Sequence, residues 1–221
     1  MTTERHFIFA KTKKQKRIQE LLEHGRLRMC RLDTYRKMEG DVIGDRNEGV
    51  GMHYSGRNPG LEVSITLPNG EVFPLTGRIE RLVVEAPERY HAVFCVTAFE
   101  TEGKGTLPFN GVVEEFVRDP RNRGFGDTMA IFKNSPEFAR RLEAAAKKAG
   151  YGLHSDLVTY LPSDYCGDVT PFQKIGDYGY QKEWRFVTNE PIPGEYLDLE
   201  LGSLLDIALW TDLTKLDVTA A

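Results

Sequence analysis

The order of the expected elements is the feature that most constrains the fold of this chain. Residues 12–24 and 135–149 carry apolar side chains at helical spacing, and each stretch is followed by a glycine, Gly25 or Gly150. Between and after them lie about eight to ten strand-like segments that do not alternate regularly with helices. This order predicts an α+β fold, with mostly antiparallel strands in a split sheet and two main helices.

The clearest strand pair is a hairpin. Residues 61–67 and 71–75 are separated by Pro68-Asn69-Gly70, a strong turn signal between strands. The remaining predicted strands are 6–10, 26–32, 79–84, 90–98, 128–133, 157–161, 183–187 and 196–201. Residues 33–60 are predicted to form a short helical turn and a long loop, and residues 101–126 another loop. Residues 203–209 fit either a helix or a last strand.

Composition narrows the class of protein. The chain has 221 residues, 40% of them hydrophobic, and a net charge of −4, so tight electrostatic binding of nucleic acid would need a local patch. Residues 1–221 show no repeat or linker and are expected to form a single domain. No apolar run is long enough to span a membrane. Cys30, Cys95 and Cys166 lack metal-ligand spacing, which favours reduced thiols and a cytoplasmic location.

The segment from Gly179 to Val187 raises the main functional question. Alternate residues of a strand share a face, so one face is expected to carry Gln181, Glu183 and Arg185, and the other Lys182, Trp184 and Phe186. In the simplest interpretation, Glu183 pairs with a cation on an exposed face. In the functional one, Glu183 lies in a ligand cleft beside the Trp184 ring, where a carboxylate could hold a ribose hydroxyl or stabilise an oxocarbenium-like charge.

Two further groups have a structural and a functional interpretation. His6 is either a structural residue at a strand end or a donor to a sugar hydroxyl or carboxamide. Arg28, Arg31 and Arg36 with Tyr35 are either a solvated edge or a pyrophosphate clamp, with the Tyr35 ring stacking on a base or nicotinamide.

Two charged stretches also have a structural and a functional interpretation. Asp41, Asp45 and Glu48 could supply oxygen ligands to a cation, but Gly and Asp also form turns, which is the interpretation that we favour. A basic run enters the first helix and is either a solvated face or a phosphate contact for nucleic acid. Its members are Lys11, Lys13, Lys14, Lys16 and Arg17.

Through most of its length, and most specifically at Glu183-Trp184-Arg185, the chain resembles uncharacterised bacterial proteins linked to abortive phage infection. They share Gly-x-Leu-Arg near the start, a central Phe-Cys strand and a late Lys-x-x-x-Tyr-x-x-Glu/Gln-x-Glu-Trp-Arg element. The last element here contains Lys174, Tyr178, Gln181, Glu183, Trp184 and Arg185. The order of a leading His6, a middle Cys95-Val96-Thr97 strand and Gln181-Lys182-Glu183 also resembles the ADP-ribosyltransferase fold.

This second resemblance implies NAD as substrate and assigns roles. Glu183 would be the catalytic glutamate, and Gln181 would position the acceptor. The resemblance implies a cofactor-binding set of His6, Arg28, Arg31, Tyr35, Thr97 and Arg185. In this set His6 holds ribose or carboxamide and an arginine holds the diphosphate, while the family's Ser-Thr-Ser triplet is absent.

Three functions follow as hypotheses. The first is an ADP-ribosyltransferase of a defence or toxin system, which cleaves the nicotinamide glycosidic bond and modifies a protein or nucleic acid. The second is a non-catalytic module that binds a ligand or nucleic acid in phage defence. The third is a metal-dependent nuclease that uses Asp41, Asp45 and Glu48, and it is the least favoured because these carboxylates crowd one loop.

Overall fold

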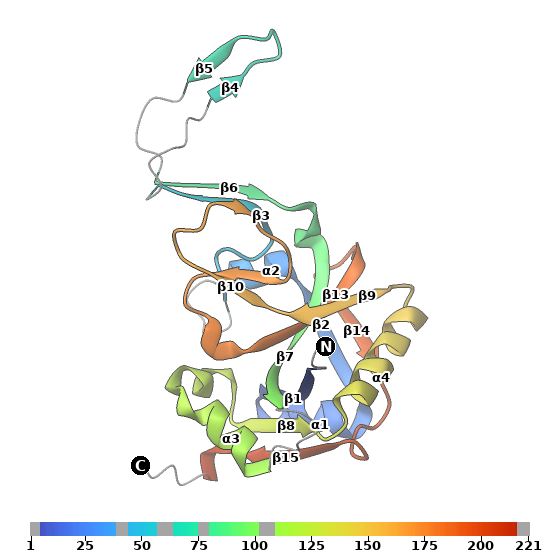
Figure 1. Cartoon of the computed structure of the whole chain (residues 1–221). Helices are drawn as coiled ribbons and strands as arrows, with labels where there is room; N and C mark the ends of the chain where they lie inside the picture. The colour runs from blue at the N-terminus through green and yellow to red at the C-terminus, as the bar shows by residue number, and fades with distance from the viewer. Residues whose placement is uncertain (1–4, 39–43, 57–63, 75–79, 102–108, 216–221) are drawn as a thin grey trace.

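The computed structural model describes residues 5–38, 44–56, 64–74, 80–101 and 109–215. Its main sheet has eight strands, in the order β14-β2-β7-β1-β8-β15, with β13 on the other edge of β7 and β9 beside β13 (Figure 1). These strands are β1 (His6–Lys13), β2 (Arg26–Arg31), β7 (His91–Thr101), β8 (Thr128–Phe132), β9 (Leu153–Leu157), β13 (Glu183–Pro191), β14 (Tyr196–Glu200) and β15 (Ala208–Asp212). All pairs in this sheet are antiparallel.

The main sheet forks at β7. On one edge, β7 pairs with β2 at Ala92 and Val93 and with β1 from Thr97 to Thr101. Residues 94–96 lie between these two stretches and pair with neither strand. On the opposite edge, β13 pairs continuously with residues 93–97. Strands β1 and β2 therefore separate at residues 94–96 of β7, and β7 itself lies between this fork and residues 184–186 of β13.

Helices cover both faces of the sheet. On one face, α1 (Gln15–His24) and α4 (Ser135–Lys148) bury Leu22, Phe138 and Leu142 against the sheet. On the other face, α3 (Phe109–Arg118) packs Val112, Val113 and Phe116 against the sheet residues Ala10, Phe99, Met129 and Ile131. Burial of these apolar surfaces is the main driving force that holds the helices in place.

Local signals set the helix ends. The Asn134 side chain accepts a hydrogen bond from the Glu137 N–H and so caps α4. Gly25 ends α1 with a φ of 65°, and a Cβ there would lie 2.1 Å from the Gly202 carbonyl oxygen, so glycine is required. The loop before β15 can therefore pack directly on the end of α1.

Smaller elements surround the main sheet. The short helix α2 (Leu32–Lys37) follows β2, and β3 (Val50–Ser55), β6 (Arg81–Glu85) and β11 (Gly167–Asp168) form a three-stranded sheet. Strands β10 (Thr159–Leu161) and β12 (Gln173–Ile175) pair in parallel. The hairpin of β4 (Ser64–Thr66) and β5 (Val72–Pro74) lies apart from the other elements in Figure 1. Short 3₁₀ turns span Pro87–Tyr90, Pro120–Phe125, Gly179–Gln181 and Leu213–Lys215.

The α+β class and the mostly antiparallel order are confirmed, as are the Asn-Gly hairpin and both predicted helices. Helix α1 starts at Gln15 rather than Thr12 because β1 continues to Lys13 on its pairing with β8. Two predicted loops were wrong in part, since one contains β3 and the other contains α3. For residues 203–209 the last-strand alternative is confirmed only at its end, because β15 begins at Ala208 and residues 203–207 form neither a helix nor a strand. Within the described residues, no helix is both long and apolar enough to cross a membrane.

Candidate functional site

Four charged side chains from distant parts of the chain form a buried ion network. The Lys174 Nζ lies 2.8 Å from Glu183 Oε2 and 3.6 Å from Glu48 Oε1. The Arg185 guanidinium forms a bidentate pair with Glu48 and lies 3.5 Å from Glu183 Oε2. All four residues are less than 9% exposed. Two negative and two positive groups therefore balance one another inside the protein.

Strand β13 fixes two members of this network. Glu183 lies opposite Thr97 and Arg185 opposite Cys95 on β7, so the two charged residues share a face, as predicted. Trp184 and Phe186 point to the other face and pack in the main core. The predicted wall of Trp184 beside Glu183 is wrong, because the Trp184 ring contacts Phe7 and Phe9 across the sheet.

Gln181 reaches the network from a turn instead of the strand. It ends the 3₁₀ turn Gly179–Gln181, and Lys182 follows in the left-handed region with a φ of 46°. This kink lets the Gln181 Oε1 accept a hydrogen bond of 2.8 Å from Lys174 Nζ. The Lys182 side chain pairs with Glu115 at the surface instead of entering the core.

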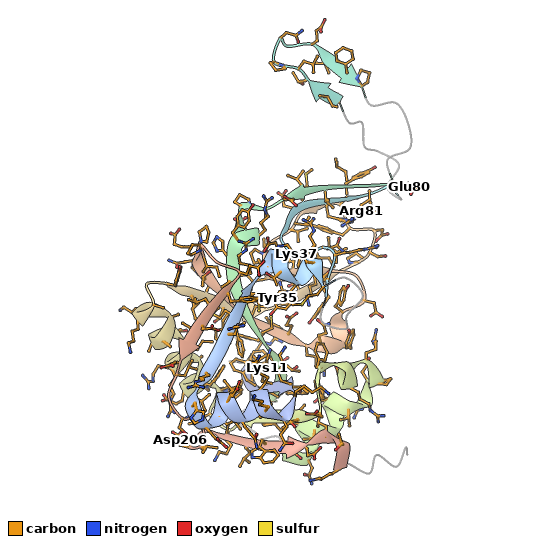
Figure 2. All side chains as sticks on the ribbon, turned by 180° about the vertical axis from the view of Figure 1, so that it is seen from behind. Lys11, Tyr35, Lys37, Glu80, Arg81 and Asp206 are labelled. Carbon is orange, nitrogen blue, oxygen red and sulfur yellow. The ribbon has the colours of Figure 1, made fainter. Side chains whose placement is uncertain are left out.

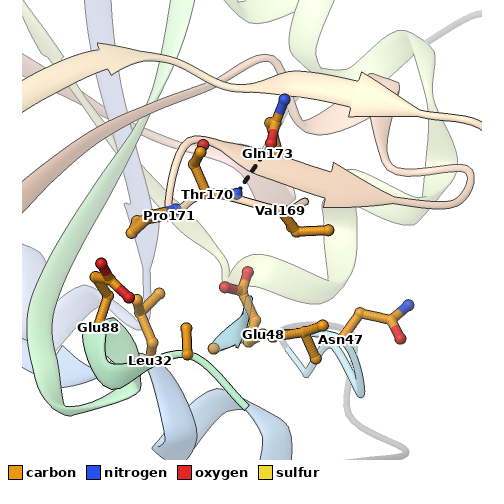
Figure 3. Close-up of a pocket in the computed structure, with 11 residues that line it drawn as sticks. Leu32, Asn47, Glu48, Glu88, Val169, Thr170, Pro171 and Gln173 are labelled. Atoms are coloured by element: carbon orange, nitrogen blue, oxygen red, sulfur yellow. Dashed lines mark hydrogen bonds between the residues drawn. The ribbon is translucent and has the colours of Figure 1, made fainter. Parts of the chain in front are cut away.

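Glu48 comes from the segment before β3 and lies below β12 and the turn before it (Figure 3). Arg185 also donates to the Pro171 carbonyl, which ties this turn to the network. The space around Glu48 and Pro171 is only about 10 Å³, the volume that one water needs. This side of the network is therefore closed by packing and offers no room for a larger ligand.

Asp45 lies next to this closed side and is 2% exposed. Its Oδ1 accepts from the Asn47 N–H, while its Oδ2 has no hydrogen-bond partner. Burial and the charge of Glu48 raise the pKa of Asp45 to about 6. Asp45 therefore carries a proton more readily than an exposed aspartate.

The charges of the network explain the titration of its members. Burial alone would raise the pKa of Glu183, but the neighbouring Arg185 and Lys174 outweigh it and lower that pKa well below its usual range. Burial alone would lower the pKa of Lys174, and the carboxylates of Glu183 and Glu48 raise it instead. Glu183 is thus ionised at every physiological pH.

The open side of the network faces a cavity of about 60 Å³. Its lining includes Lys11 of β1 and Tyr35 of α2, both labelled in Figure 2, together with Cys95, Phe125 and Glu183. Burial and the nearby charge of Glu183 raise the pKa of the Cys95 thiol, so it stays neutral. The cavity is thus narrow, and it is lined by both charged and aromatic side chains.

Lys11 and Lys13 both line this cavity, and neither forms a salt bridge with a carboxylate among the described residues; Lys11 is the more deeply placed of the two. Its Nζ donates to the Cys95 carbonyl, within the fork of the sheet, and lies 4.5 Å from the centre of the Phe94 ring. Burial, reinforced by Lys13, lowers the pKa of Lys11 to about 8. An anion in the cavity would therefore meet a lysine whose charge is not neutralised by the protein.

A second narrow space adjoins the first. It shares Lys11, Cys95 and Glu183 with the first and is also lined by Thr97 and Phe116. These last two residues line an outer pocket of about 290 Å³ as well, together with Tyr180 and Lys182. Glu183 and the outer pocket are therefore close neighbours in the structure.

The structure brings together five of the predicted site residues and separates three. Gln181, Glu183, Arg185, Tyr35 and Thr97 all line the two adjoining cavities.

His6, Arg28 and Arg31 line none of the described cavities. His6 lies at the far end of β1, opposite Thr101. Arg28 is paired with Asp198 and Arg31 with Asp33, so aspartates of the same protein hold both guanidinium groups. The expectation that these three residues line the same cleft as Glu183 is therefore wrong for this structure.

Sequence reasoning missed Glu48 and Lys11 as members of the site. Lys174 is part of the late motif, but the sequence analysis assigns it no role. Its presence in the same motif as Gln181 and Glu183 could have predicted that it contacts both side chains. Glu48 was noted only as a possible cation ligand, and no local signal marked its pairing with Arg185, which lies 137 residues away.

The basic run does not form one surface. Lys11 and Lys13 line the cavity, whereas Lys14 pairs with Asp127 and Arg17 with Glu20. Lys16 is exposed.

The proposed nuclease site finds little support. Within the described ranges, no group of three His, Cys, Asp or Glu residues is placed to hold a metal. Asp41 lies outside those ranges, and Glu48 is engaged by Arg185 and Lys174.

Comparisons with known proteins gave no relative. No protein-family model, no curated protein and no solved structure matches the chain.

Proposed function

We propose that this protein cleaves the bond between nicotinamide and ribose in NAD and transfers ADP-ribose to an acceptor, as an ADP-ribosyltransferase-like enzyme of bacterial defence. The observation that carries the proposal is the ionised Glu183 carboxylate, which lines a narrow cavity beside Gln181. A fixed negative charge in a site with little water stabilises a positive transition state strongly. The fork between β1 and β2 would correspond to the split of the sheet in that fold.

The proposed reaction needs charge stabilisation more than proton transfer. The bond from ribose C1′ to the nicotinamide nitrogen breaks, and its electron pair leaves with nicotinamide. Glu183 stabilises the resulting oxocarbenium-like charge at C1′. An acceptor oxygen or nitrogen then bonds to C1′ and releases its proton to water. Gln181 would orient the acceptor.

The sizes of the cavities suggest how the dinucleotide would be divided between them. The cavity at Glu183 measures about 60 Å³, which accommodates a ring or a phosphate rather than a dinucleotide. The outer pocket of about 290 Å³ would receive the rest of the molecule. Lys11 would face the diphosphate, a role that Arg28 and Arg31 cannot fill from their positions.

The direct test is release of free nicotinamide from NAD by the wild type and by Glu183→Gln. We expect release by the wild type and a loss of at least about a hundredfold in the variant, the usual scale for a group that stabilises transition-state charge. Glu190→Gln is the matched control, because Glu190 is an exposed residue of the same strand. Equal nicotinamide release by Glu183→Gln and the wild type would refute the role of Glu183.

Because Glu183 is also part of the ion network, its loss could simply unfold the protein. Melting curves of each variant separate these effects. Gln181→Ala provides a second check, since it leaves all four charges in place. We expect Gln181→Ala to retain hydrolysis of NAD to free ADP-ribose but to lose transfer to the acceptor.

A non-catalytic binding module is the second candidate. It is favoured by the contacts of Glu183, whose Oε2 is already held by Lys174 at 2.8 Å and Arg185 at 3.5 Å. Such a module would bind NAD or an anionic polymer without releasing nicotinamide. A thermal shift with NAD, no nicotinamide, and salt-dependent binding of single-stranded nucleic acid that is weakened by Lys16→Met would favour it.

A further inference from the structure

The outer pocket of about 290 Å³ is lined by side chains from three separate segments of the chain. Phe99 of β7 and Phe116 of α3 supply apolar lining, and both belong to the core beneath α3. Tyr180 lines the pocket from the turn Gly179–Gln181 and is only partly buried. Small-molecule sites start at about 300 Å³, so this pocket suits one ring system rather than a whole dinucleotide.

Asn122 brings an unpartnered hydrogen-bond acceptor to this pocket. Its side chain is 2% exposed, and its Nδ2 donates a hydrogen bond of 2.8 Å to the Phe116 carbonyl. A carbonyl can only accept, so this bond fixes which end of the amide is the nitrogen and which is Oδ1. No group among the described residues donates to Oδ1. A ligand N–H would supply the hydrogen bond that this buried oxygen lacks.

Tyr180 brings a donor, because two hydrogen bonds in series set the direction of its hydroxyl. The Lys174 ammonium can only donate, and it binds Gln181 Oε1 at 2.8 Å. The Gln181 amide therefore turns its Nε2 to the Tyr180 oxygen, at 3.2 Å. Since this oxygen accepts from Gln181, its own O–H hydrogen is left to donate, and no described residue accepts it.

The Tyr180 ring is held in place by Arg121. The Arg121 guanidinium lies 3.9 Å from the ring centre and is itself paired with Asp119 and Asp177. Arg121 is not among the residues that line the outer pocket. It therefore covers the ring from another side and leaves the pocket side free for a planar group to stack on.

The charges around the pocket leave one cation for a ligand. Glu115 and Asp119 line the pocket, but Lys182 holds the first and Arg121 the second. Arg118 also lines the pocket, is exposed, and forms no ion pair within the described part of the chain. A free guanidinium is the side chain that best matches a phosphate group.

We propose that the outer pocket binds the base of a nucleotide, with Arg118 facing its phosphate. The base stacks beside the Tyr180 ring, an N–H of the base donates to Asn122 Oδ1, and a ring nitrogen or carbonyl oxygen accepts from the Tyr180 hydroxyl. An N–H beside an acceptor is what the hydrogen-bonding edges of nucleobases offer. Binding of a base here does not require cleavage of NAD, so the inference goes beyond the proposed function.

The first test is the affinity for AMP, measured by isothermal titration calorimetry. Tyr180→Phe keeps the ring and removes only the hydroxyl, so we expect it to bind AMP about three- to tenfold more weakly than the wild type. Tyr178→Phe is the matched control, because Tyr178 belongs to the same segment but lines a different cavity. Its affinity for AMP should equal that of the wild type.

The second test changes the ligand and leaves the protein intact. Purine riboside 5′-monophosphate is AMP without the amino group, so its base has no N–H to donate to Asn122 Oδ1. We expect it to bind to the wild type at least about tenfold more weakly than AMP. No binding of AMP, or an affinity that either Tyr180→Phe or the loss of the amino group leaves unchanged, would overturn the proposal.

Competition with NAD identifies the source of the base. Displacement of AMP by NAD would assign the pocket to the adenine of NAD, and simultaneous binding of both would assign it to a separate nucleotide. AMP contains no nicotinamide, so its binding is independent of the release assay. AMP binding without release of nicotinamide would refute the proposed function and keep this inference, and nicotinamide release without AMP binding would do the reverse.

Discussion

Lys174 and Lys11 are two lysines of the same cavity with opposite electrostatic environments. Lys174 contacts two carboxylates, which raise its pKa, whereas Lys11 has a carbonyl and an aromatic ring as neighbours, and burial lowers its pKa to about 8. The first charge is neutralised by the protein and stabilises the fold. The second is left for a ligand to neutralise. Burial of a charge therefore does not reveal its function, but the presence or absence of a counter-ion does.

The largest expected effect on stability comes from removing Lys174, whose charge the two carboxylates neutralise. Lys174→Met removes a cation that lies 2.8 Å from Glu183 and leaves the two carboxylates with Arg185 alone. We expect a loss of about 3–5 kcal/mol in the free energy of unfolding, measured with urea. Lys182→Met, which removes the exposed partner of Glu115, should cost less than about 1 kcal/mol. Similar losses in both variants would contradict the comparison.

Removing Lys11 is expected to change the free energy of unfolding in the opposite direction. Its folded pKa of about 8 lies below its ordinary value of 10.5, so below pH 8 the folded protein bears the full cost of a buried charge. Replacing it in Lys11→Met should raise the free energy of unfolding at pH 7 by about 2 kcal/mol.

The pH dependence checks the same assignment. Between pH 8 and 10.5 the folded lysine loses its proton while the unfolded one keeps it, so the stability of the wild type rises relative to Lys11→Met. The difference between the two proteins should therefore shrink from pH 7 to pH 10. A constant difference, or the same behaviour in Lys13→Met, would show that Lys11 bears no buried charge.

Asp45 tests the closed side of the network. Its folded pKa of about 6 lies above the ordinary 3.8, so stability is lost as the pH rises from about 4 through 6 and the buried group ionises. Asp45→Asn keeps the acceptor for the Asn47 N–H and should stabilise the protein by about 1–2 kcal/mol at pH 7. Asp164→Asn is the exposed control. No gain in stability from Asp45→Asn at pH 7 would contradict the buried charge.

The smallest expected effect on stability is the one caused by binding of pyrophosphate. Pyrophosphate at about 10 mM should stabilise the wild type by about 1 kcal/mol if Lys11 faces an anion site of millimolar affinity. The same addition should leave Lys11→Met unchanged. Stabilisation of both proteins to the same extent would place the anion elsewhere on the surface.

Part of this site was predictable from the sequence because its pattern is local. The alternation along residues 183–186 predicted which residues share a face, and the structure confirms it for Glu183 and Arg185. The Asn-Gly turn and the helix ahead of Gly150 were predicted from equally short signals.

The rest depends on pairing between distant segments. Glu48 lies in a stretch rich in Gly and Asp that looks like a loop, and only the folded chain brings it to Arg185. Helix α3 was missed because Asn110, Gly111, Val112 and Val113 are weak helix formers. Its burial against Phe99 and Met129 overrides that preference.

The left-handed conformation of Lys182 separates two parts of the site that adjoin in sequence. From Glu183 onward, the position of every side chain is fixed by strands β7 and β9 on either side. Before Lys182 no such pairing applies, and Gln181 is placed by its own turn. The turn before Lys182 and the strand after it are therefore positioned independently of each other. The turn could be lengthened, shortened or exchanged while the charged face of β13 keeps its register.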